Sequence, residues 1–231
     1  ATLSKPTGPP VVYLIQKQLP AASIGNRVMQ ALTPGMVRVL VRRTLQEMQR
    51  VWEFNQEQAK LQVALDGQIS NWSVDGFDPR NPCVDGESTL TYLDTSTPLY
   101  RVDGVEQLNT ELFLRSAPSF LVWILRILFL EDVVGRYYDL HKVTVDLAAN
   151  FYKEQRADLL PAIIAEANDF FAGEAASLGV KPLAEKEVRS YYREDALIWT
   201  LYLSMRRLDR LLRTRLMRQA YPYILPGKIE R

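Results

Sequence analysis

The sequence predicts a mainly α fold with a small β-hairpin island, an α+β arrangement within a single domain. Apolar residues recur at helical spacing through most of the chain after residue 33, whereas short β-type runs and turn pairs are confined to residues 61–103. With 231 residues, 47% hydrophobic and 24% charged, the composition is that of an ordinary globular domain. We expect one domain over 1–231, with a lead-in strand and linker at 1–20 and a helical subdomain at 104–231.

The N-terminal region is expected to contain one strand and two helices. Val11–Ile15 is a β-branched and aromatic run that predicts a strand. Ser23 is placed to cap a short helix that follows it. Thr33 before Pro34 is a clear helix start, with a capping hydroxyl and then proline at the first helical position, and the apolar spacing continues to about Gln58.

The island holds β-type runs separated by Asp-Gly turn pairs. The runs are Leu61–Leu65, Trp72–Val74 and Leu90–Leu93. If the second and third runs pair as an antiparallel hairpin, the residues flanking them at one end come together. Asn71 lies just before one strand and Asp94 just after the other, and Asp66 lies on the short loop that leads into the hairpin. We therefore expect these three side chains to converge.

Five further helices are expected after the island, punctuated by glycine and proline. They span roughly 105–115, 118–134, 136–155, 158–176 and 185–219. The run Phe120–Leu130 is hydrophobic nearly all round and predicts a buried central helix. Arg126 interrupts this run, which is far short of the ~20 residues needed to span a bilayer.

Two carboxylates and a carboxamide at one point would offer hard oxygen ligands and a proton acceptor. Such donors suit one or two Mg²⁺ ions that carry phosphates, together with a base for an incoming hydroxyl. The acidic middle of the chain, between two basic ends, fits the same chemistry. The residues themselves thus predict metal and base chemistry at one end of the hairpin.

The segments Val63–Val74 and Leu90–Asp94 resemble the catalytic and metal-binding loops of kinase-like phosphotransferases, most closely the aminoglycoside phosphotransferase and choline kinase type. That family has a mostly helical C-terminal lobe around such a hairpin. The resemblance implies Asp66 as the catalytic base, Asn71 and Asp94 as metal ligands, and Mg²⁺ and ATP as cofactors. It implies transfer of the ATP γ-phosphate to a small hydroxylated acceptor.

The sequence departs from this family pattern at several points. Ala64 stands two residues before the implied base, where the family usually has histidine, and Thr95-Ser96 follows Asp94 where protein kinases commonly have Phe-Gly. No glycine-rich phosphate loop or strand lysine precedes Val11, so we expect the N-terminal lobe to be absent, divergent or cut off. A non-catalytic, pseudokinase-like protein is the alternative that these departures favour.

Structural roles are open alternatives for the same residues. Asp66 can serve only as a turn residue, Asn71 can bond its own loop, and Asp94 can belong to a turn or a helix cap. His141 is expected to be a structural helix residue, and Cys83 is expected to be inert because no activating pair accompanies it.

The last predicted helix carries an arginine-rich face opposite leucines. Its arginines are Arg206, Arg207, Arg210, Arg213, Arg215 and Arg218. A helical interaction module that uses this face is the second function class, with a solvated helix face as the structural alternative. The sequence pI of about 8.0 and the lack of a nucleic-acid motif argue against nucleic acid as a partner.

The remaining observations concern location and partners. The single cysteine rules out an internal disulfide framework, and no charged-then-apolar leader opens the sequence. We expect a cytoplasmic protein without a membrane span. The expected ligands are a nucleotide and a small-molecule acceptor, with a protein partner in the interaction-module alternative.

Overall fold

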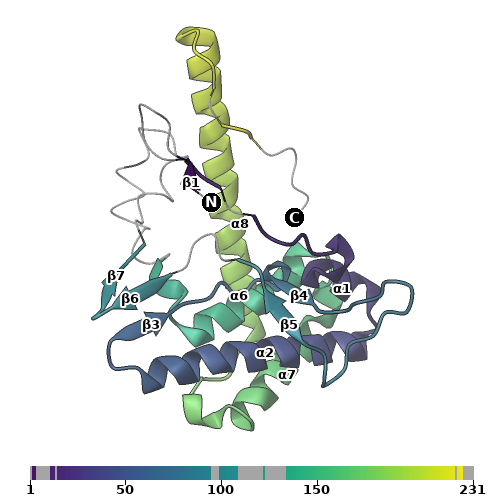
Figure 1. Cartoon of the computed structure of the whole chain (residues 1–231). Helices are drawn as coiled ribbons and strands as arrows, with labels where there is room; N and C mark the ends of the chain where they lie inside the picture. The colour runs from purple at the N-terminus through teal and green to yellow at the C-terminus, as the bar shows by residue number, and fades with distance from the viewer. Residues whose placement is uncertain are drawn as a thin grey trace.

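The computed structural model describes residues 2–3, 11–13, 15–94, 99–108, 122, 134–221 and 223–225, which form a mainly helical fold with small antiparallel sheets (Figure 1). Its helices are α1 (Gly25–Ala31), α2 (Pro34–Glu57), α6 (Leu140–Lys153), α7 (Leu160–Ala172) and α8 (Glu185–Leu211), which a π-helical turn (Leu212–Leu216) extends. Its strands are β1 (Thr2–Leu3), β2 (Val11–Val12), β3 (Leu61–Val63), β4 (Trp72–Val74), β5 (Leu90–Tyr92), β6 (Tyr100–Val102) and β7 (Val105–Glu106). The predicted α+β class is confirmed.

Helix α2 begins where the sequence predicts. The Thr33 hydroxyl accepts a hydrogen bond from the backbone N–H of Met36 at 3.4 Å, and Pro34 occupies the first turn. One face of the helix is buried in the core, including Val37, Leu40, Val41, Leu45 and Met48. The observed end at Glu57 lies one residue before the predicted end.

Strands β4 and β5 pair as the predicted antiparallel hairpin. Trp72 lies opposite Tyr92 and Val74 lies opposite Leu90. All three residues of β4 are buried, and the Trp72 and Tyr92 rings meet edge to face with centroids 5.0 Å apart. This pairing fixes which residues meet at each end of the hairpin.

A second hairpin, β6–β7, was not predicted, and the helix predicted from residue 105 is wrong at its start. Asp103 and Gly104 both have positive φ, at 51° and 78°, as a two-residue hairpin turn of type I′ requires. Strand β3, which lies in the predicted run at 61–65, pairs with β6. The three strands β3, β6 and β7 therefore form one antiparallel sheet. Within the predicted helices 105–115 and 118–134, residues 109–121 and 123–133 lie outside the described residues, and the same holds for most of the Phe120–Leu130 run.

Other boundaries shifted by small amounts. Among the described residues of the predicted strand Val11–Ile15, the first two form β2, which pairs with β1. Ser23 does not cap α1, because its hydroxyl donates to the Pro20 carbonyl at 2.8 Å and shares a 2.7 Å hydrogen bond with Ser73. The helices predicted at 136–155, 158–176 and 185–219 correspond to α6, α7 and α8, each somewhat shorter than predicted apart from the π-helical extension of α8.

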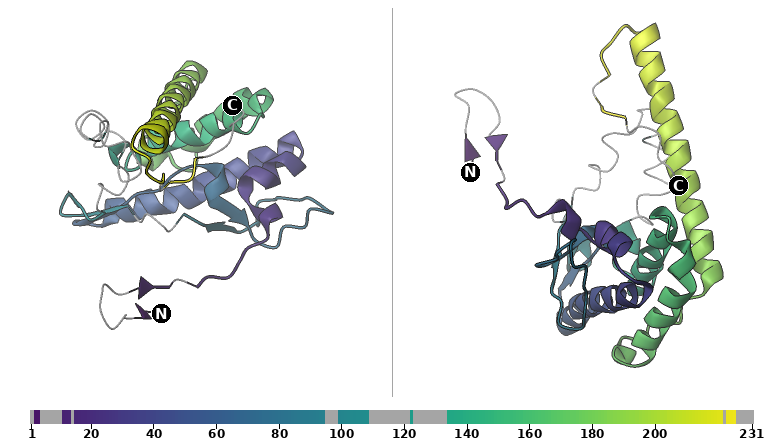
Figure 2. Two further views of the ribbon diagram at one scale, coloured as in Figure 1. Left: turned by 90° about the horizontal axis from the view of Figure 1, so that it is seen from above. Right: turned by 90° about the vertical axis from the view of Figure 1, so that its right-hand side faces the viewer.

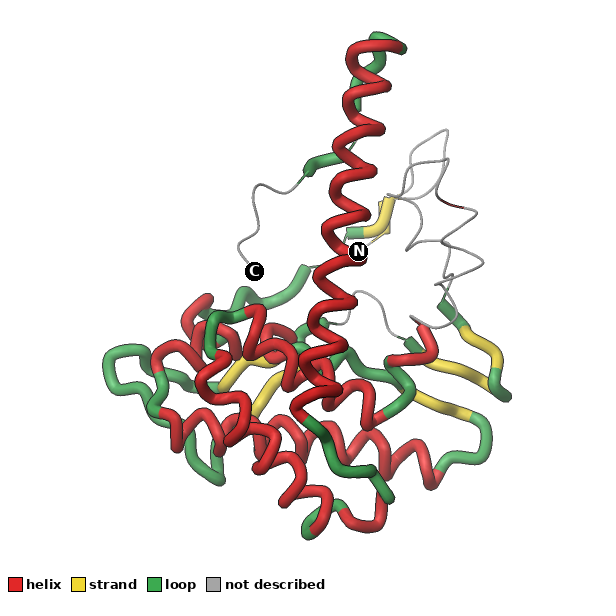
Figure 3. Tube along the Cα trace, turned by 180° about the vertical axis from the view of Figure 1, so that it is seen from behind, coloured by secondary structure: helices red, strands yellow, loops and turns green. Residues whose placement is uncertain are grey.

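The core lies between α2, α6 and α7, with the β4–β5 hairpin packed beside them (Figures 1 and 2). The first half of α8 packs on α6, whereas its second half extends out of the helical body (Figure 3). Within the described ranges, no helix is both long and apolar enough to cross a bilayer. The helices therefore hold the β4–β5 hairpin and the loop before it in place.

Candidate functional site

The loop from Asp66 to Asn71 is clamped between two helices. A Cβ added at Gly25 of α1 would lie 2.2 Å from the Ile69 carbonyl oxygen, and one added at Gly67 would lie 2.6 Å from the carbonyl oxygen of Val143 in α6. Such distances are far inside van der Waals contact, so only glycine permits these two backbone approaches. The loop is thus fixed by close packing on both sides.

Hydrogen bonds anchor the same loop to α6. The Asn150 side chain accepts from the backbone N–H of Ile69 at 3.1 Å and donates to the Asp146 carbonyl at 2.8 Å. Asn150 is buried, so its side chain satisfies a backbone donor that water does not reach. The position of the loop is therefore tied to the turns of α6.

The three predicted site residues come together around the hydroxyl of Tyr92. The backbone N–H of Asp66 donates to this hydroxyl at 3.1 Å, and the Asn71 side chain also hydrogen-bonds to it. The backbone N–H of Leu93 donates to the Asn71 carbonyl at 2.7 Å, which places Asp94 beside Asn71 at the same end of the hairpin. Burial, with the charges of Asp66 and Asp94, raises the pKa of the Tyr92 hydroxyl. The backbone of Asp66, the side chain of Asn71 and the charge of Asp94 thus all act on one hydroxyl.

The Asp66 carboxyl has a strongly perturbed proton affinity. Burial, followed by the negative charge of Asp146, raises the pKa of Asp66 to about 6, and Asp94 adds to the rise. A hydrogen bond from the backbone N–H of Gln68 to Oδ1 at 3.0 Å opposes the shift. This bond is also the turn interaction that the structural alternative predicts, so Asp66 both shapes the loop and carries a tuned carboxyl.

A buried charged network, which the sequence reasoning missed, lies behind the loop. Asp146 is 5% exposed and accepts from the Tyr191 hydroxyl at 2.8 Å. The Lys153 ammonium lies 3.3 Å from Asp146 and 3.4 Å from Asp195. A sequence signal for it exists, because Asp146 and Asn150 stand four residues apart within an otherwise apolar stretch of helix.

The donor set at the hairpin end fits a hard cation that takes part of its coordination from elsewhere. Across the described part of the chain, no three His, Cys, Asp or Glu side chains form a group that could hold a metal ion. The predicted ligands are a carboxamide and a carboxylate. Magnesium commonly binds one or two carboxylates and completes its octahedron with water and substrate phosphates, which these residues would permit. Asn71 and Asp94 are the residues that would hold it.

The remaining residues that the sequence analysis named are His141, Cys83 and the arginines of α8. His141 is buried, its Nδ1 lies 3.2 Å from the Lys181 carbonyl oxygen, and its Nε2 lies 2.8 Å from Glu187. Cys83 is an exposed free cysteine. In α8, the side chain of Arg206 is covered by the C-terminal segment through the Ile224 carbonyl at 3.3 Å, whereas Arg207 and Arg210 are exposed.

Comparison with known proteins places the chain in a family. A family model described as a family of unknown function, DUF6206, matches residues 1–211. No curated protein matches, and no solved structure matches.

Proposed function

We propose that this chain, which belongs to the family of unknown function DUF6206, is the helical lobe of a kinase-like phosphotransferase in the cytoplasm. It would transfer the γ-phosphate of ATP to a small hydroxylated molecule. The observation that carries the proposal is the convergence of Asp66, Asn71 and Asp94 at one end of the β4–β5 hairpin. The resemblance of the two loops to the kinase-like family supports the same roles.

In this proposal Asp66 is the general base. With a pKa of about 6, its carboxyl is mostly ionised at pH 7 yet binds a proton more strongly than an ordinary aspartate. It would accept the proton of the acceptor hydroxyl as the new bond from that oxygen to the γ-phosphorus forms. The bond from phosphorus to the bridging oxygen breaks, and ADP leaves.

Asn71 and Asp94 would position the nucleotide through Mg²⁺. When bound, the ion would neutralise negative charge on the phosphates. The hydrogen bond from the Leu93 N–H to the Asn71 carbonyl fixes the register of the two residues, and the Asn71 side chain is held by its bond to Tyr92. The clamped loop supplies the rigidity that in-line transfer needs.

The test is binding and turnover with Mg²⁺–ATP, using the full-length protein. A ligand at about 100 times its Kd stabilises the native state by ~2.7 kcal/mol, which for a chain of this size raises Tm by roughly 5–10 °C. Asp94→Asn should remove the Mg²⁺-dependent part of the shift, and Asp66→Asn should keep binding while losing transfer. The matched control is Asp75→Asn, an exposed aspartate at the opposite end of the hairpin. No shift in the full-length protein, or equal losses in the control, would rule the proposal out.

A second candidate function, a protein-interaction module, is favoured by the outer half of α8. Its exposed leucines lie on one helical face and are Leu197 (69% exposed), Leu201 (56%), Leu208 (45%) and Leu211 (49%). The exposed Arg207 borders this face, whereas Arg210 lies nearer the opposite side of the helix. The nearby Asp209 pairs with Arg213 at 3.1 Å. This chemistry suits an acidic amphipathic helix of a partner protein.

A synthetic helical peptide with leucines at heptad spacing and glutamates beside them tests that surface. The chain should bind the peptide, and a Leu201→Glu, Leu208→Glu double variant should lose at least tenfold in affinity. Binding to anionic phospholipid vesicles without peptide binding would assign the surface to lipid. A dimer in light scattering that the double variant abolishes would assign it to a second copy. Either result contradicts the peptide assignment.

A further inference from the structure

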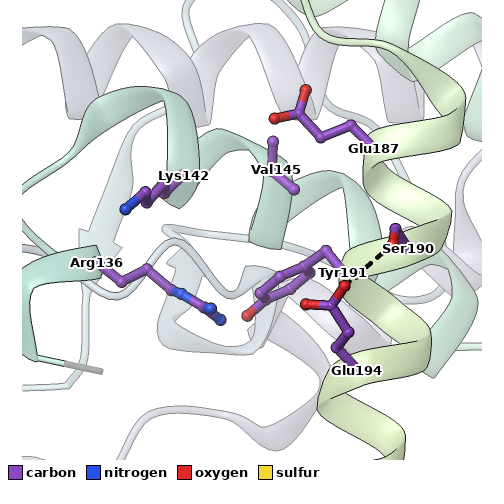
Figure 4. A pocket seen from close by; sticks show the side chains of 7 residues that line it. All are labelled: Arg136, Lys142, Val145, Glu187, Ser190, Tyr191 and Glu194. Carbon is purple, nitrogen blue, oxygen red and sulfur yellow. Dashed lines mark hydrogen bonds between the residues drawn. The ribbon is translucent and has the colours of Figure 1, made fainter. Parts of the chain in front are cut away.

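A cavity of about 290 Å³ lies between α8 on one side and the start of α6, with the segment before it, on the other (Figure 4). Its polar lining consists of Arg136, Lys142, Glu187, Ser190, Tyr191 and Glu194. The volume lies at the lower end of the range for ligand sites, which suits a molecule of metabolite size. The lining combines two cations and two carboxylates around so small a space.

The cationic side of the cavity holds two side chains with little to neutralise them. The Arg136 guanidinium stacks over the Tyr191 ring at 4.5 Å from its centroid. Judged over the described ranges, neither Arg136 nor Lys142 forms a side-chain hydrogen bond or an ion pair with the protein. Figure 4 shows Arg136 reaching toward Tyr191 of α8, whereas the Lys142 ammonium points away from that helix. Stacking holds the guanidinium in place and leaves its N–H donors available to a carboxylate.

The anionic side of the cavity comes from α8. Glu194 accepts a hydrogen bond from the Ser190 hydroxyl at 3.1 Å. Glu187 bonds His141 at 2.8 Å and lies 3.9 Å from Lys181, and both contacts use the same oxygen, Oε1. About two turns of α8 separate these carboxylates, so both lie along the α8 wall of the cavity but at different heights.

The cavity adjoins the proposed phosphotransfer site through two tyrosines. Tyr191 lines the cavity and donates its hydroxyl to Asp146, whose charge acts on Asp66. Tyr137 is close enough to both groups that the Asp66 charge raises the pKa of its hydroxyl and the Arg136 charge lowers it, although burial dominates. The cavity is therefore linked to the proposed base through Tyr191 and Asp146.

We propose that this cavity holds the acceptor and that the acceptor is a small hydroxylated zwitterion of the hydroxy amino acid class. Its carboxylate is received by Arg136, its ammonium by Glu194, and its hydroxyl is left for phosphorylation. The role of this ligand as phosphate acceptor rests on the proposed function. The charge pattern of the cavity carries the choice of a zwitterion over a simple acid or a simple amine.

Calorimetric titration of the full chain without nucleotide tests the charge pattern directly. The probes are L-serine and L-homoserine, with D-glycerate, which lacks the ammonium group, and ethanolamine, which lacks the carboxylate. We expect one of the two amino acids to bind at least tenfold more tightly than either single-charge analogue. Arg136→Gln should weaken amino acid binding at least tenfold and leave ethanolamine unchanged, and Glu194→Gln should do so while leaving glycerate unchanged. Arg193→Gln, on α8 outside the cavity lining, is the matched control.

The outcomes separate this inference from the phosphotransferase proposal. Amino acid binding that depends on Arg136 and Glu194 supports the cavity assignment, whether or not Mg²⁺–ATP produces a melting shift. The absence of a Mg²⁺–ATP shift would overturn the phosphotransferase proposal alone. A Mg²⁺–ATP shift without amino acid binding at millimolar concentration overturns the cavity assignment alone. Equal binding of serine, glycerate and ethanolamine, or equal losses in the Arg193→Gln control, overturns it as well.

Discussion

The ionised Asp66 carboxylate should destabilise the folded protein at neutral pH. Its pKa of about 6 in the fold, against 3.8 for an ordinary aspartate, means that the folded state holds the proton more tightly than the unfolded state. Stability from this group is therefore fully present below about pH 4 and is lost as pH rises through 6. Each pKa unit corresponds to about 1.4 kcal/mol, so the full loss is about 3 kcal/mol.

Asp66→Asn removes this charge and keeps the loop bond. The amide oxygen of asparagine can still accept from the backbone N–H of Gln68, so the turn at the start of the loop is retained. The variant should therefore be more stable than the parent at pH 7.5 by about 1–3 kcal/mol. Between pH 6 and pH 4 the difference between variant and parent should shrink by about that amount.

Urea denaturation of both proteins at pH 4.0, 5.0, 6.0 and 7.5, followed by circular dichroism, measures the difference. Asp75→Asn is the control, since this exposed residue should change stability by less than about 0.5 kcal/mol at every pH. A variant that is no more stable than the parent at pH 7.5, or a gain that does not depend on pH, would refute the assignment of a raised pKa to Asp66. A carboxylate that costs stability where a turn needs only an amide is typical of a functional residue.

The packing around the loop gives two further predictions. Gly67→Ala should destabilise the protein by about 1–3 kcal/mol in urea denaturation, because the new Cβ meets the Val143 carbonyl, whereas Gly86→Ala, with open space around it, serves as the control and should change little. Asn150→Ala should cost about 1–3 kcal/mol by leaving the buried backbone N–H of Ile69 without its acceptor. It should also speed amide exchange at Ile69, and unchanged exchange there would contradict the anchoring role.

Local signals carried much of the fold. The Thr33-Pro34 cap placed the start of α2, and the β-type runs around residues 72–74 and 90–92 predicted their pairing. The hairpin at Asp103-Gly104 had an equally local signal in its Asp-Gly turn pair. The apolar spacing from residue 105 predicts a helix instead, and that prediction is wrong at its start. Such features are readable because a cap, a turn or a strand alternation depends on a few adjacent residues.

In the candidate site, some residues could be placed from the sequence and others only from the tertiary structure. The meeting of Asp66, Asn71 and Asp94 followed from the sequence, because the ends of an antiparallel pair are fixed once the strands are known. The sequence could not place Asp146 and Tyr191, which lie about 80 and 125 residues beyond Asp66 and reach it only because α6 packs on the loop and α8 packs on α6. The raised pKa of Asp66 was decided at that level too, since burial and the charge of Asp146 come from helix packing, which no spacing along the chain encodes.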